Sequence, residues 1–231
     1  MKVREVDTTK ADRESAMAMF DALHKLYPLS MMTVLDAFAR NGQLTVQSYR
    51  PYIDTKNLTC WELGQQHEQD LRELTPNVKI GCSYQQMELA VKSGETFDMI
   101  VIDTPQGLHQ DFLGVKHVEH FDFLKSSLAL LNDNGLIVLY VNKHPYDRED
   151  LGSHGYDEYA EYDFKTWMAE RKWYYGTEVI SESRAINTYA AMLAREGYRV
   201  RQVVTMPCFS DVEGREPYAF RLALDVQRLP S

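Results

Sequence analysis

Residues 32–36 read M-T-V-L-D, a short apolar run that closes on an acid, Asp36. Four further short, mainly apolar runs follow: L-T-C-W-E at 58–62, V-K-I-G-C at 78–82, F-D-M-I-V-I at 97–102 and L-I-V-L-Y-V-N at 136–142. Continuous apolar runs of this length are typical of parallel strands that are buried on both faces. We expect helices between them near 43–52, 65–74, 84–93 and 116–131, and a turn, N-D-N-G at 132–135, that leads into the fifth run. The alternation predicts right-handed crossovers and a parallel sheet.

Two other regions flank this core. The first thirty residues predict a helix from about Thr9 to Tyr27, and Pro28 marks its stop. After Lys143 comes a polar, aromatic-rich stretch, which begins an insertion at about 144–176. We expect a helix near 164–175 within this insertion and another near 183–196 after it. Residues 200–206 and 218–226 then read as an antiparallel hairpin. We expect an N-terminal helical segment at 1–30 and one α/β domain at 31–231.

Composition limits the function classes. The chain has 231 residues, 44% of them hydrophobic and 26% charged, as in an ordinary globular protein. Its net charge of −9 gives no overall attraction to nucleic acid or to an anionic membrane. No apolar run approaches the roughly 20 residues that span a bilayer. The cysteines are three in number and widely separated, which predicts no disulfide framework, no metal site and a reducing, cytoplasmic setting.

The loop after the first strand carries a resemblance to a known family. Five parallel strands and a terminal hairpin over residues 30–227 are similar to the class I S-adenosylmethionine-dependent methyltransferases. This implies a Rossmann-like three-layer sandwich with a mostly parallel seven-stranded sheet. The family's loop is approximately D-x-(G/F)-x-G-x-G, to which Asp36, Phe38 and Gly42 correspond. Arg40 stands where a glycine is usual; it either pairs with the methionine carboxylate of the cofactor or merely closes the loop.

The resemblance implies further cofactor contacts at the next two strand ends. Glu62, followed by Leu63, stands where the family has an acid that accepts hydrogen bonds from both ribose hydroxyls. The alternative is that Glu62 caps the helix that starts near Gln65. Cys82 and Ser83 occupy the positions beside the adenine, where the family commonly has an acid and a small residue. Tyr84 is placed to stack on the base or to pack in the core.

The fourth strand ends in D-T-P-Q-G, which resembles a diverged (D/N)-P-P-(Y/F) element of amino-group methyltransferases. On this resemblance Asp103, Pro105 and Gln106 face the transferred methyl, and Asp103 orients or deprotonates the acceptor. Gln106 replaces the aromatic residue, so base stacking from this position is lost. The simpler interpretation of Asp103 is a turn residue at a strand end. A Pro-Cys pair is absent, which excludes cytosine C5 methylation through a thiolate.

Lys143, at the end of the fifth strand, invites comparison with ribose methyltransferases that use a lysine-aspartate-lysine-glutamate set. Asp103 and Lys143 would form the middle pair, with Lys25 and Glu178 as outer partners. A lysine with a lowered pKa can deprotonate a hydroxyl. A solvated Lys143 is the alternative.

The sequence therefore predicts methyl transfer from S-adenosyl-L-methionine to an acceptor that it does not identify. The D-T-P-Q element is compatible with a nucleic acid or nucleotide, whereas the acidic balance favours a small molecule or a protein. Two alternatives remain: a non-catalytic binding protein on a decayed methyltransferase scaffold, and an NAD-dependent oxidoreductase. The latter normally needs G-x-G-x-x-G after the first strand, which A-F-A-R-N-G does not supply.

Overall fold

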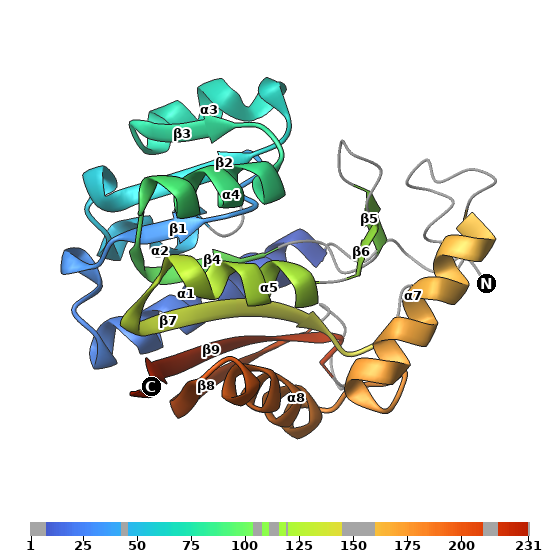
Figure 1. Ribbon diagram of the computed structural model, residues 1–231. Coiled ribbons are helices and arrows are strands. Elements are labelled where there is room, and N and C mark those ends of the chain that lie inside the picture. Colours follow the sequence, from blue (N-terminus) through green and yellow to red (C-terminus); the bar gives the residue numbers. More distant parts are fainter. Residues whose placement is uncertain are drawn as a thin grey trace.

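The computed structural model describes residues 8–42, 46–103, 108–110, 116–118, 120–144, 160–209 and 217–230. These residues build one seven-stranded sheet between two layers of helices, as Figure 1 shows. The parallel strands are β1 (Val34–Asp36), β2 (Leu58–Glu62), β3 (Asn77–Ile80), β4 (Phe97–Ile102) and β7 (Leu131–Asn142). The antiparallel hairpin consists of β8 (Tyr198–Cys208) and β9 (Ala219–Arg228).

The strand order is β3-β2-β1-β4-β7-β9-β8. The hairpin adds to the same sheet, and its second strand lies between β7 and β8, antiparallel to both. This confirms the predicted architecture, including the antiparallel position of the last strand. A separate two-stranded ribbon, β5 (Leu108–Gln110) with β6 (Lys116–Val118), was not predicted.

Helices cover both faces of the sheet. One layer holds α1 (Thr8–Leu26), α2 (Val46–Tyr49) and α3 (Glu68–Leu74), and the other holds α4 (Ser83–Ser93), α5 (Phe121–Ser127) and α8 (Glu182–Arg195). The sixteen-residue α7 (Ala160–Tyr175) lies beyond the ends to which the parallel strands run (Figure 1). Single 3₁₀ turns occur at Leu29–Met31, Arg50–Tyr52, Thr55–Asn57, Gln65–His67 and Leu128–Leu130.

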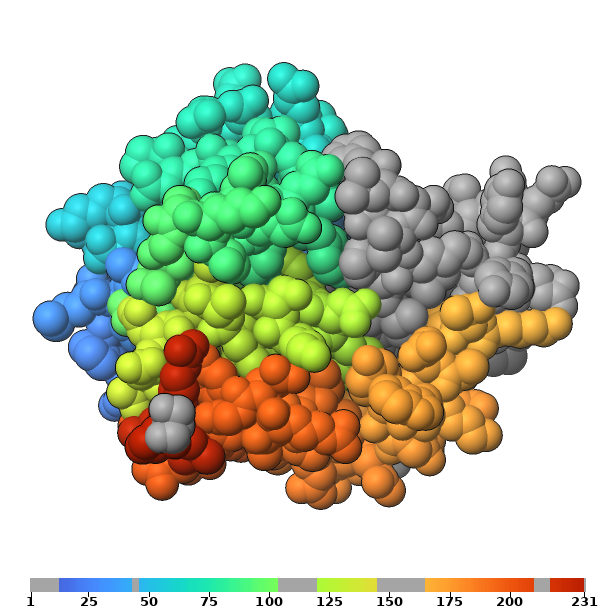
Figure 2. Space-filling model, in the orientation of Figure 1, coloured from blue at the N-terminus to red at the C-terminus, as the bar shows by residue number. Residues whose placement is uncertain are grey.

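The core has two halves because each strand alternates its side chains between the two faces. On β4, Ile100 and Ile102 join the cluster under α4, α5 and α8, whereas Met99 and Val101 join the cluster under α1, α2 and α3. In the space-filling view, α4, α5, α8 and α7 form one continuous surface (Figure 2). The alternation of side chains between the two faces also determines which side chains at the strand ends lie on the same face and can contact one another.

Two local predictions are wrong. The helix expected at 116–131 is interrupted: residues 116–118 are strand β6, and the α-helix covers only Phe121–Ser127. The N-D-N-G sequence at 132–135, which we expected to be a turn before the strand, belongs to β7 itself. There the register with β4 jumps, since Phe97 pairs with Leu131 and Met99 with Leu136. The Asn132 side chain donates to Asp98 Oδ1 at 2.6 Å, which holds the bulge against β4.

Gly135 in this bulge tests how tightly β7 packs on β4. A Cβ at this position would lie 2.7 Å from Leu131 Cδ1 and 3.0 Å from the backbone oxygen of Asp98. We expect Gly135→Ala to lower the free energy of unfolding by about 1–3 kcal/mol, as overpacking does. Urea denaturation measures it, with Asn134→Ala at the exposed neighbouring position as control. Equal stability of the two variants would contradict the tight packing.

Candidate functional site at the carboxyl edge of the sheet

The strand order reverses between β1 and β4. From β1 the chain moves outward to β2 and β3, then returns to place β4 on the other side of β1. The crevice outside the carboxyl ends of strands at such a switch point is where open α/β sheets bind ligands. Asp36 ends β1, Glu62 ends β2 and Asp103 follows β4 directly. The structure therefore brings the three predicted acids to one edge.

Asp36 is a fully buried carboxylate. Its Oδ2 accepts a hydrogen bond of 2.7 Å from the Tyr49 hydroxyl of α2, and its Oδ1 accepts one of 3.2 Å from the Phe38 N–H. Burial raises the pKa of Asp36 to about 7, and the negative charges of Asp103 and Glu62 add to this rise, while the bonds from Tyr49 and Phe38 oppose it. Tyr49 was missed in the sequence, where no motif marks it.

The loop after β1 is fixed to its neighbours through backbone hydrogen bonds. The Ala37 N–H donates to Val101 O of β4 at 3.1 Å, and the Ala39 N–H donates to Trp61 O of β2 at 3.0 Å. Arg40 has a φ of 50° and Gly42 a φ of 73°, both in the left-handed region. Arg40 thus adopts a backbone conformation that costs a non-glycine residue about 1–2 kcal/mol. Its side chain is exposed.

Glu62 connects the loops that follow β1 and β2. Its Oε2 accepts from the Arg40 N–H at 2.7 Å, and its Oε1 accepts from the Gly64 N–H at 2.8 Å. The second bond lies at the start of the 3₁₀ turn Gln65–His67. A carboxylate offers about four lone-pair sites, so these two bonds leave capacity for further donors. The next residue, Leu63, is 57% exposed.

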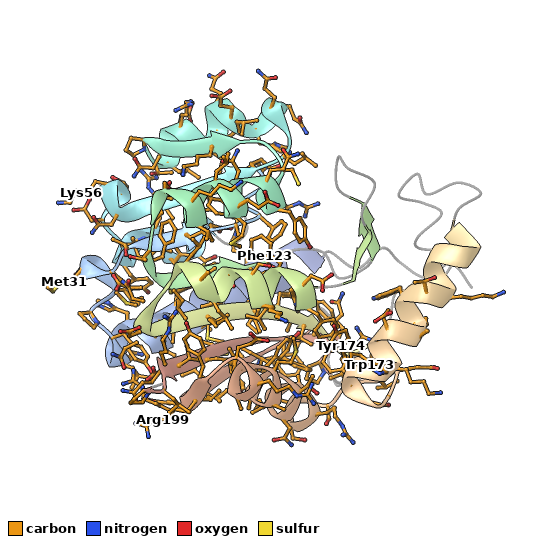
Figure 3. All side chains as sticks on the ribbon, in the orientation of Figure 1. Met31, Lys56, Phe123, Trp173, Tyr174 and Arg199 are labelled. Atoms are coloured by element: carbon orange, nitrogen blue, oxygen red, sulfur yellow. The ribbon has the colours of Figure 1, made fainter. Side chains whose placement is uncertain are left out.

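The start of α4 closes the crevice with small and aromatic side chains. Cys82 precedes the helix and is buried, and the buried Ser83 hydroxyl donates to Ala37 O at 2.6 Å. Tyr84 packs edge-on against Phe123 of α5 at 5.3 Å, and Phe123 in turn lies 4.7 Å from Phe38, between ring centroids. These three rings come from three separate segments, and Phe123 is marked in Figure 3.

Asp103 forms an ion pair that the sequence did not predict. Its Oδ2 lies 3.2 Å from Nη1 of Arg221, a residue of β9. The Arg221 side chain is 2% exposed and that of Asp103 is 16% exposed. The guanidinium carbon of Arg221 lies 4.9 Å from the centroid of the Tyr140 ring on β7. The one available signal was a cation inside the apolar run Y-A-F-R-L-A-L.

Lys143 lies just beyond β7, where its backbone is held on two sides. Its N–H donates to Tyr218 O and its carbonyl accepts from the Ile180 N–H, both at 2.8 Å. The fully buried Arg171 of α7 donates to Asn142 O at 2.6 Å and so attaches α7 to the end of β7. The Lys143 side chain is half-buried.

The four-residue set built on Lys143 does not come together. Lys25 is on the last turn of α1, paired with Asp21 at 2.6 Å. Tyr27, two residues on, donates to Asp225, which pairs in register with Leu136 near the start of the regular part of β7. Lys25 therefore lies towards the amino edge of the sheet, opposite the edge that carries Asp103.

A buried histidine joins the helices to the sheet near this edge. His120 Nε2 lies 2.8 Å from Tyr140 O, and its Nδ1 lies 2.9 Å from the Tyr189 hydroxyl of α8. That hydroxyl is 2.7 Å from the hydroxyl of Tyr175 on α7. The sequence alone gave His120 no role. The network ties α5, α7 and α8 to β7.

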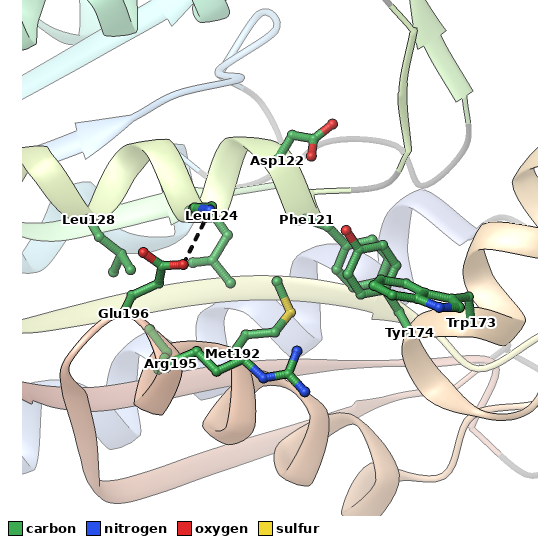
Figure 4. Close-up of a pocket in the computed structure, with 11 residues that line it drawn as sticks. Phe121, Asp122, Leu124, Leu128, Trp173, Tyr174, Met192, Arg195 and Glu196 are labelled. Atoms are coloured by element: carbon green, nitrogen blue, oxygen red, sulfur yellow. Dashed lines mark ion pairs between the residues drawn. The ribbon is translucent and has the colours of Figure 1, made fainter.

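A pocket of about 220 Å³ lies on the helical layer, away from the strand ends. Figure 4 shows its wall, where the Phe121 and Tyr174 rings stack with centroids 3.7 Å apart, beside Trp173. Trp173 is 71% exposed. The opposite wall carries Glu196, which directly follows α8 and pairs with Lys125 at 3.4 Å. The charges that line the pocket are of both signs and indicate no particular ligand.

Some predicted features lie elsewhere. Pro105 and Gln106 are outside the described residues, as are Tyr146, Tyr156 and Tyr159 of the 144–176 insertion. None of the helices within the described ranges is long and apolar enough to cross a membrane. In the same part of the chain, no three His, Cys, Asp or Glu side chains are grouped so that they could hold a metal ion.

Comparisons with solved structures identify the fold. The sequence matches no protein-family model and no curated protein. Solved structures do match. SMU.776, provisionally assigned as a methyltransferase and complexed with S-adenosylhomocysteine, has a TM-score of 0.58 and 13% identity over 94% of this chain and 49% of that one. This chain thus spans about half the length of SMU.776.

Two further structures are matched over most of their length. TYW2 of M. jannaschii, in complex with AdoMet, has a TM-score of 0.53 and 13% identity over 99% of this chain and 80% of that one. PH1948 of Pyrococcus horikoshii, provisionally assigned as an RNA methyltransferase, has a TM-score of 0.54 and 10% identity over 94% and 85%. The chain has the fold of the class I S-adenosylmethionine-dependent methyltransferases.

Asp36 makes a measurable contribution to the pH dependence of stability. Its pKa rises from 3.8 to about 7 on folding, so the native state holds this proton more firmly than the unfolded chain. The resulting stabilisation, on the order of 4 kcal/mol, is complete below about pH 4 and is lost as the pH rises to 7. Relative to Asp36→Asn, the wild type should lose about 2–3 kcal/mol between pH 5 and pH 7.

Urea denaturation at intervals from pH 5 to pH 8 measures this difference. The control is Asp54→Asn, because Asp54 pairs with Lys56 at the surface and its pKa is lowered, so it titrates below this range. Parallel stability curves for the wild type and Asp36→Asn would show that Asp36 does not titrate there.

Proposed function

We propose that the chain is an S-adenosylmethionine-dependent methyltransferase whose cofactor lies across the carboxyl ends of β1, β2 and β4. One observation carries the proposal. Three acids lie at the ends of these strands at the switch point, and the loop after β1 has left-handed backbone at Arg40 and Gly42. The left-handed loop would let the backbone approach a bound cofactor closely, and the acids would supply hydrogen-bond acceptors on both sides of that loop.

The residues present fit the nucleoside end of this cofactor. Glu62 has two carboxylate oxygens, each with one backbone donor, and would accept the two ribose hydroxyls with its remaining lone pairs. Phe38, Tyr84 and Phe123 form an apolar wall for a base. Because the Ser83 hydroxyl donates to Ala37 O, it would serve the base as an acceptor. Cys82 and Leu63 would flank these contacts.

The sulfonium end fits the charge of the crevice. S-adenosylmethionine supplies an electrophilic methyl group on a positively charged sulfur. Burial is the main cause of the raised pKa of Asp36, and the negative charge of Asp103 adds to it, so a cation between the two strand ends would relieve that repulsion. Arg40, with its exposed side chain, is the candidate partner for the methionine carboxylate.

Asp103 is the candidate for orienting the acceptor. Unlike the fully buried Asp36, its side chain is 16% exposed, and it would accept a hydrogen bond from the nucleophile so that a lone pair faces the methyl group. The family resemblance assigns Pro105 and Gln106 to the acceptor side of the methyl group as well, and Lys143 lies just beyond the neighbouring strand β7. PH1948 is named as an RNA methyltransferase, which makes RNA the first acceptor class to test.

Calorimetric titration with S-adenosylmethionine, S-adenosylhomocysteine and NAD tests the proposal and its alternatives together. The wild type should bind the first two and not NAD. Glu62→Ala should weaken S-adenosylhomocysteine binding by about 1.5–3 kcal/mol, because it removes charge-assisted hydrogen bonds. Glu68→Ala is the matched control, since Glu68 pairs with Arg72 on the outer surface of α3. NAD binding alone would favour an oxidoreductase, and equal affinities of the two variants would remove Glu62 from the site.

Turnover separates an enzyme from a decayed scaffold. We expect transfer of a labelled methyl group from S-adenosylmethionine to a fraction of total RNA, protein or metabolites. Asp103→Asn should lower this rate about 100-fold or more while S-adenosylhomocysteine affinity stays within a few fold, since transition-state interactions affect rate more than binding. Full activity of the variant would show that Asp103 is not catalytic. Cofactor binding without transfer to any fraction would favour a binding protein.

A further inference from the structure

Arg221 is a buried cation inside the sheet. It is 1% exposed and lies on β9, opposite Tyr140 of β7 and Met206 of β8 in the strand register. A guanidinium is always charged, and its removal from water is costly unless a partner compensates. For stability alone, an apolar residue of similar size would often serve as well as a buried ion pair. The position of Arg221 therefore calls for a reason beyond packing.

Its reach across β7 is defined by the register. Val101 of β4 pairs with Val138 of β7, so Asp103 and Tyr140, each two residues further on, follow the same cross-strand line. Tyr140 pairs with Arg221 on the next strand. Arg221 thus extends along the face of the Tyr140 ring, with its guanidinium carbon 4.9 Å from the centroid, and reaches Asp103 Oδ2 at 3.2 Å.

This geometry constrains the direction of the Asp103 carboxylate. The guanidinium is planar and its own rotation is limited by the aromatic ring and by burial. The Arg221 side chain that pairs with Asp103 is almost completely buried, whereas the Asp103 side chain keeps 16% of its surface exposed at the strand end. A carboxylate held from behind in this way presents its acceptor lone pairs in one orientation.

We propose that Arg221 is a positioning residue, which aims the Asp103 carboxylate at the hydrogen-bond donor of the methyl acceptor. The inference rests on the proposed function, because it assigns Asp103 to the site where the methyl group is transferred. In this proposal Arg221 contacts neither ligand. Its effect on the acceptor passes through the Asp103 carboxylate, and a purely structural ion pair would have no such effect.

Sinefungin tests the inference without knowledge of the acceptor. In this analogue an ammonium-bearing carbon replaces the methyl-bearing sulfur, so its N–H groups take the place of the transferred methyl and donate towards the side from which the acceptor would approach. The measured quantity is the ratio of sinefungin to S-adenosylhomocysteine affinity, determined by calorimetry. Since both ligands share the nucleoside and the amino acid part, changes in the fold or in the rest of the pocket cancel in this ratio.

We expect Asp103→Asn to lower the ratio about tenfold, the loss of one charge-assisted hydrogen bond. Arg221→Met should lower it at least threefold, and Arg221→Lys, which keeps the charge without the planar fork, should recover part of this loss. In the Asp103→Asn background, Arg221→Met should change the ratio no further. Arg201→Met is the matched control, because Arg201 pairs with Asp225 at the other end of the same hairpin.

Each other result overturns the inference. A ratio that rises in Arg221→Met would show that Arg221 only neutralises charge. An equal change in the wild-type and Asp103→Asn backgrounds would show that Arg221 acts independently of the carboxylate, and an unchanged ratio would make the pair structural. If the wild type binds neither S-adenosylmethionine nor S-adenosylhomocysteine, the proposed function fails first and the inference with it. Loss of S-adenosylhomocysteine binding only in Arg221→Met and Arg221→Lys would assign Arg221 to folding of the pocket.

Discussion

The buried carboxylate of Asp36 is the group on which the shape of the crevice depends. With no access to water, it must find its hydrogen-bond donors inside the protein, and it takes them from the Tyr49 hydroxyl and the Phe38 N–H. These bonds tie the end of β1, the loop after it and helix α2 together. Glu62 then holds the same loop from β2 through the Arg40 N–H. The loop that would approach a nucleoside is therefore formed before any ligand binds, which lowers the entropy cost of binding.

Charges on one face of the sheet follow from the same alternation that divides the core. Tyr140 and Arg221 share a face with Met99 and Val101, whereas their sequence neighbours point to the other helical layer. The acids at the ends of β1 and β4 thus stand in a row that Arg221 completes two strands further along. Because the cation lies on the side away from β1, it compensates Asp103 without separating that carboxylate from the crevice.

Most of the parallel sheet and the three acids at its edge could be predicted, because parallel strands give two signals in a sequence. Their apolar runs are continuous, and their last residues gather at one edge, so Asp36, Glu62 and Asp103 were readable as strand ends. The N-D-N-G stretch was misread because its turn-like composition is equally suited to a bulge, and only the Asn132–Asp98 contact distinguishes the two. Tyr49 and His120 were not readable, since their partners, Asp36 and Tyr189, are 13 and 69 residues away.

The role of Arg221 was not predicted because β9 runs antiparallel to the other strands at this edge. In a parallel strand the residue that reaches the ligand edge is the last one, and the acids were found there. An antiparallel strand at the same edge contributes its beginning, so the residues of β9 that approach the site are Ala219 to Arg221 and not Arg228. The final hairpin thus does more than extend the sheet: by running β9 backwards beside β7, it brings a cation to an edge whose other strands end in acids. An all-parallel sheet of the same length would carry Arg221 at the opposite edge, with Asp103 uncompensated.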